Sequence, residues 1–253
     1  MIKRSSFKLM IAVMVGLFLS LLSSLLGCDS AWEKKSAHDA YNRLILADAP
    51  CFDNVCFGNE SRNTYSEHLQ KNRFVEAIHD NGGSPLNFTI VNPDSEGMGD
   101  EATGFGVLQF GPDTYGRFEI LESIYINLSG LTLGTAIDVL GEPEEYLFIT
   151  GCGMGYWVLG LALYPSKGIF LRSDFQMRQP TQEHLDANKE VVVAYTTPQH
   201  YEEYLRQILD TSILNSVIFD LEPQVNADLL LSQIQPWPGL EAAPTPSINL
   251  CPR

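Results

Sequence analysis

The chain has 253 residues, of which 45% are hydrophobic and 19% are charged. Its 31 Asp and Glu residues outnumber 16 Lys and Arg residues, so the net charge at pH 7 is −15. An acidic surface of this kind repels phosphate backbones, which excludes nucleic acid as an expected partner.

The first 27 residues have the pattern of an export signal. Three basic residues and no acidic one accompany the apolar run at 9–27, as in the charged and apolar regions of a signal peptide. Leu25-Leu26-Gly27-Cys28 resembles the bacterial lipoprotein lipobox, in which the cysteine sulfur receives a diacylglycerol before the signal peptide is removed. The alternatives are an ordinary signal and an uncleaved membrane helix, because the run has 19 residues and about 20 span a bilayer.

The lipobox resemblance implies that residues 28–253 are anchored in a membrane, on its extracytoplasmic side, by acyl chains on Cys28. Two or three acyl chains hold a protein on a bilayer far longer than one chain does. Without the signal peptide the charge becomes −18, from 13 basic and 31 acidic residues. We expect residues 28–50 to form a lipidated tether that passes into a short helix, with Tyr41, Leu44 and Ile45 on one side.

Four cysteines follow the anchor position: Cys51, Cys56, Cys152 and Cys251. An even number of cysteines in an exported chain indicates disulfide bonds, and four cysteines allow three connectivities. Cys51 and Cys56 are close enough in sequence to pair with each other, which would leave Cys152 to pair with Cys251 and fasten the C-terminal tail. A four-thiolate zinc site and free buried thiols remain alternatives, and the sequence shows no motif for any cofactor.

The periodicity of the chain predicts the order of its elements. A helix is expected over 61–79, and strands over 86–91, 103–110 and 117–128. A second helix has Thr132 as its N-cap and Gly141 just past its end, with Ile137 and Leu140 facing inward. Further elements are strands at 145–150, 156–164, 169–175 and 191–195, a turn at 165–168, and a helix at 197–209.

These elements predict an α+β fold of two tandem, two-layer modules, each with a helix packed on one side of an antiparallel sheet. The first module covers 51–129, and the second, with an added helix, covers 130–235. Residues 236–253 hold five of the 14 prolines and are predicted to form an extended tail.

The segment "LSGLTLGTAIDVLGEPEEYLF" (128–148) has a short helix that is closed by Gly-x-Pro and followed by strands. It is similar to the helix–sheet module of outer-membrane assembly lipoproteins and secreted β-lactamase inhibitory proteins. The resemblance implies a two-layer α+β unit that binds proteins and has no catalytic residues.

Side-chain alternation suggests a candidate binding face on the second module. Large apolar residues share one side of the strand at 156–164, which predicts that the opposite side is open. The candidate residues of that open face are Tyr156, Tyr164, Phe170 and Arg172, and aromatic side chains of this kind are enriched at protein interfaces. In the alternative arrangement, residues 177–253 cover the face.

The sequence has no recognisable catalytic motif, so we expect a non-enzymatic protein that binds an envelope protein or takes part in envelope assembly. A secreted hydrolase that acts on glycan remains the alternative. The two carboxylates of such an enzyme come from distant strands and leave no local spacing in the sequence.

Overall fold

The computed structural model describes residues 39–58, 60–80, 85–91, 103–113, 115, 117–152, 156–177, 187–215, 226–242 and 245–250. The chain divides into two compact units, Met1–Ala40 and Tyr41–Arg253, and the second unit contains all the strands of the described sheet. The signal segment and Cys28 lie outside the described residues. Within the described ranges, no helix has both the length and the apolar character needed to cross a membrane.

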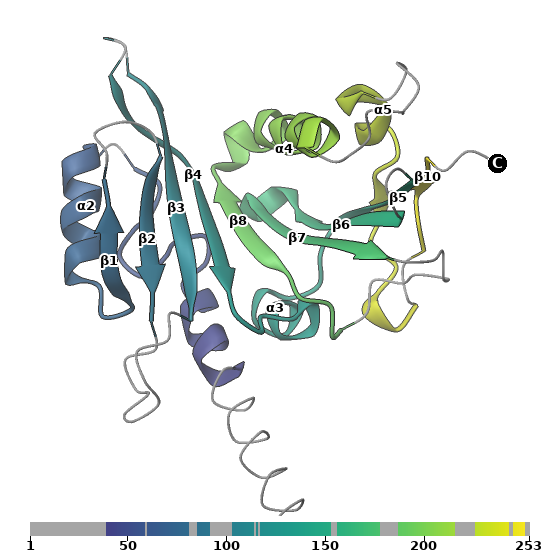
Figure 1. Cartoon of the computed structure of the whole chain (residues 1–253), viewed down its shortest axis with the longest axis horizontal. Coiled ribbons are helices and arrows are strands. Elements are labelled where there is room, and N and C mark those ends of the chain that lie inside the picture. Colours follow the sequence, from purple (N-terminus) through teal and green to yellow (C-terminus); the bar gives the residue numbers. More distant parts are fainter. Residues whose placement is uncertain are drawn as a thin grey trace, which may run out of the picture. The chain divides into compact units, whose positions relative to one another are not determined.

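One large sheet, almost entirely antiparallel, forms the centre of the second unit (Figure 1). Its strand order is β1-β2-β3-β4-β8-β7-β6-β5-β10, and β9 also pairs with β5. The bounds are β1 (Val75–His79), β2 (Leu86–Ile90), β3 (Gly104–Pro112), β4 (Phe118–Leu128), β5 (Glu145–Cys152), β6 (Tyr156–Tyr164), β7 (Ile169–Met177), β8 (Val192–Thr196), β9 (Gln235–Pro236) and β10 (Ile248–Asn249). The predicted α+β class is confirmed, and the pairing of β4 with β8 joins strands from both halves of the chain in one sheet.

Helices pack on both faces of this sheet. The helices are α2 (Arg62–Lys71), α3 (Leu133–Leu140), α4 (Tyr201–Asn215) and α5 (Ala227–Leu231). One hydrophobic core contains the buried side chains of α2 and α3, and a second core on the other face contains those of α4 and α5. Figure 1 shows α3 and the α4–α5 pair on opposite sides of the strands β5–β8. The prediction of two layers is therefore wrong for this half of the sheet, which has three.

The helix predicted over 61–79 is shorter than expected, because it ends at Lys71. Asn72 has an extended backbone, and its side-chain Oδ1 accepts a hydrogen bond from the backbone N–H of Phe74 at 2.8 Å. Such a local bond gives the backbone an alternative to the helix. The following residues form β1, where Val75 and Ile78 pair with β2.

The second predicted helix is confirmed as α3. The Thr132 side chain accepts a hydrogen bond from the N–H of Thr135 at 3.2 Å, and Gly141 ends the helix at a φ of 84°, a conformation that glycine adopts without the cost of a Cβ. The predicted turn at 165–168 is also present, with a 3₁₀ turn over Pro165–Lys167.

The short helix that leads into the second unit spans residues 39–46. Tyr41 and Ile45 are buried as predicted, but Leu44 is 45% exposed. The prediction for Leu44 is wrong because Asn42 occupies the inner side of this helix instead. Asn42 is buried, and its Nδ2 donates a hydrogen bond to the carbonyl oxygen of Ser129 at 3.4 Å.

The proline-rich tail lies along the outer edge of β5. β9 pairs with Glu145 and Tyr146, and β10 pairs in parallel with Ile149 and Thr150. The tail therefore covers backbone donors and acceptors that an edge strand would otherwise expose.

Candidate binding face

Two of the four residues of the predicted binding face, Tyr164 and Phe170, lie in the interior of the structure. Tyr164 and Phe170 are both fully buried, and they belong to different hydrophobic cores on opposite faces of the sheet. The Tyr156 backbone is part of β6, while its side chain lies outside the described residues. Arg172 is half-buried and lines a cavity.

The register of the β6–β7 hairpin explains why Tyr164 and Phe170 lie on opposite faces of the sheet. Leu163 is paired with Phe170, and Tyr164 is paired with Ile169. Cross-strand partners share a face, so Phe170 lies with Leu163 beneath α4, where its ring stacks on Tyr201 with centroids 4.2 Å apart. Tyr164 faces the other core, and its hydroxyl donates a hydrogen bond to the carbonyl oxygen of Gly141 at 2.8 Å. Burial raises the pKa of Tyr164.

A different part of the sheet carries exposed apolar side chains. Strands β2, β3 and β4 bury one row of residues against α2 and the helix at 39–46, and leave the alternate row partly exposed. We call this second row the open face. It contains Asn87, Thr89, Phe105, Val107, Ile120, Tyr125 and Asn127.

Phe105 and Ile120 are the most exposed apolar residues of the open face, at 47% each. The Phe105 ring lies 5.9 Å from the ring of Tyr125 on the neighbouring strand. Val107 is opposite Tyr125 in the register, so Phe105, Val107 and Tyr125 are neighbours on the open face. Ile120 is opposite Gly111, further along β3. A group of adjacent apolar side chains favours an interaction site, because single scattered apolar residues need no such explanation.

A cavity of about 360 Å³ adjoins the open face. Its lining includes Tyr125, Asn127, Ser129, Arg172, Glu190 and Val192. The pairing of β7 with β8 brings two of these lining residues together, because Val192 is opposite Arg172 in the strand register. Glu190 is the one carboxylate among the described lining residues of this cavity.

Arg172 lines this cavity and also acts on a residue of α4. Burial raises the pKa of Tyr204, while a hydrogen bond with Ser123 and the positive charge of Arg172 oppose that rise. The guanidinium is therefore close enough to α4 to act on a tyrosine there. A half-buried Arg beside an aromatic surface is typical of the residues that dominate binding energy at interfaces.

The sequence of β3 indicates that both faces of this strand carry apolar residues, but it does not show which face is exposed. In "TGFGVLQF", Phe105 and Val107 alternate with Gly106 and Leu108. Both sets contain apolar residues, so periodicity shows a two-faced strand without showing which face is covered.

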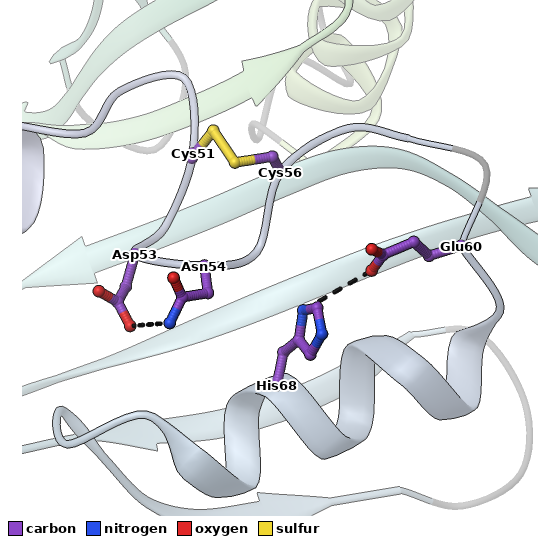
Figure 2. The surroundings of a disulfide bond; sticks show 6 residues. All are labelled: Cys51, Asp53, Asn54, Cys56, Glu60 and His68. Atoms are coloured by element: carbon purple, nitrogen blue, oxygen red, sulfur yellow. Dashed lines mark hydrogen bonds and ion pairs between the residues drawn. A yellow bond between two sulfur atoms is a disulfide. The ribbon is translucent and has the colours of Figure 1, made fainter.

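The disulfide between Cys51 and Cys56 is present, with sulfurs 2.07 Å apart (Figure 2). It closes a turn in which Phe52 and Val55 exchange backbone hydrogen bonds at 2.9 Å. Both of these side chains are buried in the core beneath β2 and β3. The bridge therefore fastens the segment that precedes α2, and the pairing of these two cysteines is confirmed.

The predicted pairing of Cys152 with Cys251 falls outside the described residues. The Cys152 backbone belongs to β5, but its side chain and the whole of Cys251 lie outside the described residues. Across the described ranges, His, Cys, Asp and Glu side chains form no group of three that could hold a metal ion.

Comparisons with protein families, curated proteins and solved structures found no match for this chain.

Proposed function

We propose that this protein is an exported lipoprotein, acylated at Cys28, that binds an envelope protein through the open face and catalyses no reaction. The lipobox-like sequence supports the anchor, and the Cys51–Cys56 disulfide is consistent with an oxidising compartment. In this proposal the tether at 28–50 holds the acidic body beside the bilayer.

We also propose that the two halves of the sheet are tandem copies of one module. Each half consists of a helix followed by four strands, α2 with β1–β4 and α3 with β5–β8. Their order in the sheet is mirrored, β1-β2-β3-β4 and then β8-β7-β6-β5. Both module helices contribute to the same hydrophobic core, as expected if a pseudo-two-fold axis relates the halves.

The observation that carries the binding proposal is the exposure of Phe105 and Ile120 on a sheet face that α4 and α5 leave uncovered. Phe105, Val107 and Tyr125 would form the apolar centre of an interface, and Ile120, further along the same face, would extend it. Asn127, Arg172 and Glu190 around the cavity would supply its polar rim, an arrangement that protein interfaces share.

The test is affinity capture of partners from detergent-solubilised membranes of the cell that makes this protein, with the full acylated chain as bait. We expect a specific partner with the natural chain and at least tenfold less of it with Phe105→Ser or Ile120→Ser. Leu44→Ser is the matched control, because Leu44 has nearly the same exposure, 45%, and lies on the helix at 39–46 instead. Equal capture by all variants, or capture of no specific partner, would contradict the proposal.

The anchor has its own test. Replacing Cys28 with Ser removes the sulfur that would carry lipid, so the chain should accumulate as an uncleaved precursor or be released from the membrane. Fractionation and intact mass measurement distinguish these products from the natural form. A processed Cys28→Ser chain that stays bound to the membrane would show that the anchor is not an acylated cysteine.

A further inference from the structure

We infer that Cys152 and Cys251 form a second disulfide, which fastens the C-terminal strand to the edge of β5. This inference does not depend on the proposed partner. It rests on the described strand register, on the faces of the two strands, and on the pairing of the other two cysteines.

The parallel register of β10 on β5 aligns the two cysteines. Ile248 is opposite Ile149, and Asn249 is opposite Thr150, so each residue faces the one 99 positions earlier. The next backbone N–H, that of Leu250, donates to the carbonyl oxygen of Thr150 at 2.8 Å, which continues the same ladder. One position further, the same spacing puts Cys251 opposite Cys152.

Continuing the alternation of the described strand residues would put the two cysteines on the same face of the sheet. Ile248 and Leu250 pack against the core beneath α4 and α5, so alternation assigns Cys251 to the opposite face. On β5, Ile149 belongs to the α4–α5 core, while Phe148 belongs to the core on the other face. By the same alternation the inference assigns Cys152 to the face of Phe148, which is the face it assigns to Cys251.

The spacing of neighbouring strands suits a disulfide. Adjacent strands lie about 4.8 Å apart, within the roughly 4.4–6.8 Å that separates the Cα atoms of bonded cysteines. Pro252 has no backbone N–H and cannot extend the ladder, so Cys251 is the last position at which the strand can be held in this register.

The bonding of Cys51 to Cys56 removes two of the three connectivities that four cysteines allow. Forming the second bond oxidises two thiols. One cysteine thiolate attacks the disulfide of an oxidant and forms a mixed disulfide with it. The other cysteine thiolate then attacks the protein sulfur of that mixed disulfide and releases the oxidant. One S–S bond forms, the S–S bond of the oxidant breaks, and two electrons and two protons pass to the oxidant. The oxidant is a protein or small-molecule disulfide and leaves as a dithiol.

Peptide mapping of the full chain tests the bond directly. The protein is alkylated during lysis, digested with trypsin without reduction, and analysed by mass spectrometry. Cleavage after Arg117, Lys167 and Arg206 places Cys152 in peptide 118–167 and Cys251 in peptide 207–253. We expect these two peptides to run as one species that separates on reduction. Recovery of both peptides with alkylated cysteines, or of either peptide linked to Cys51 or Cys56, would overturn the inference.

Hydrogen exchange tests the consequence for the strand. We expect Cys251→Ser and Cys152→Ser to speed exchange of the Leu250 amide at least tenfold, because the bond no longer limits fraying of the tail. Cys56→Ser is the matched control and should leave that amide unchanged. Unchanged exchange in Cys251→Ser would show that no bond holds the strand, and if a variant does not fold, the peptide map of the natural chain decides the question.

Discussion

Arg62 is the one buried cation in the part of the chain that the structure describes, at 7% exposure. Its Nη2 lies 2.6 Å from a carboxylate oxygen of Asp80, and its guanidinium carbon lies 5.0 Å from the centre of the Phe110 ring. The side chain therefore connects α2 to the chain after β1 and to β3, through both charge and packing.

Replacing Arg62 with Ala should lower the free energy of unfolding by about 2–3 kcal/mol, because it removes the packing of a buried side chain together with its ion pair to the partly exposed Asp80. The matched control is Arg43→Ala. Arg43 also lies 2.6 Å from an aspartate, Asp138, but both side chains are exposed, so its loss should cost less than about 1 kcal/mol. Urea unfolding of both variants measures the difference, and equal losses would contradict the assignment.

At the scale of the element, the N-terminus of α3 depends on a single side chain. Thr132 accepts the hydrogen bond from Thr135 that the first turn of the helix cannot satisfy internally. Because α3 has only eight residues, this cap contributes a large share of its local stability.

Thr132→Ala should therefore lower the free energy of unfolding by about 1 kcal/mol, while Thr132→Ser should keep most of the stability because serine retains the accepting oxygen. Thermal or urea unfolding measures both changes. If serine cost as much as alanine, the methyl group of Thr132, and not its hydroxyl, would be the stabilising part.

At the scale of the whole molecule, buried tyrosines link stability to alkaline pH. Burial raises the pKa of Tyr41 to about 12, and a hydrogen bond with Thr103 lowers it in part. Burial also raises the pKa values of Tyr195 and Tyr201. In each case the folded protein keeps the phenol protonated at a pH where the unfolded chain has begun to ionise.

The difference in phenol pKa between the folded protein and the unfolded chain makes stability depend on pH. Below about pH 10 both states hold the proton and the stability is fully present, and as pH rises through the folded pKa values it is lost. We expect the free energy of unfolding to fall steeply above about pH 10, because ionisation of the buried phenols then favours the unfolded chain. Tyr41→Phe should make the fall shallower, while Tyr115→Phe should not, because Tyr115 is 83% exposed. A free energy of unfolding that stays constant from about pH 10 to about pH 12 would contradict this prediction.

Local signals in the sequence predicted most of the elements. The limits of α3, the turn at 165–168 and the strands from β2 to β8 follow from caps, glycines and alternation that act within a few residues. The helix expected over 61–79 was too long because Asn72 favours a turn that the apolar periodicity does not reveal. The anchor at Cys28 and the bond between Cys152 and Cys251 stay predictions.

The sequence by itself determined the limits of α3, the turn at 165–168, and that each strand has two different faces, since neighbouring residues decide those features. Only the tertiary structure decided which faces are covered. Leu163 and Tyr164 are both apolar enough to be buried, and the hairpin register and the docking of α4 gave each of them a core. Exposure of Phe105 and Ile120 results from where distant helices do not pack, and no local spacing records that.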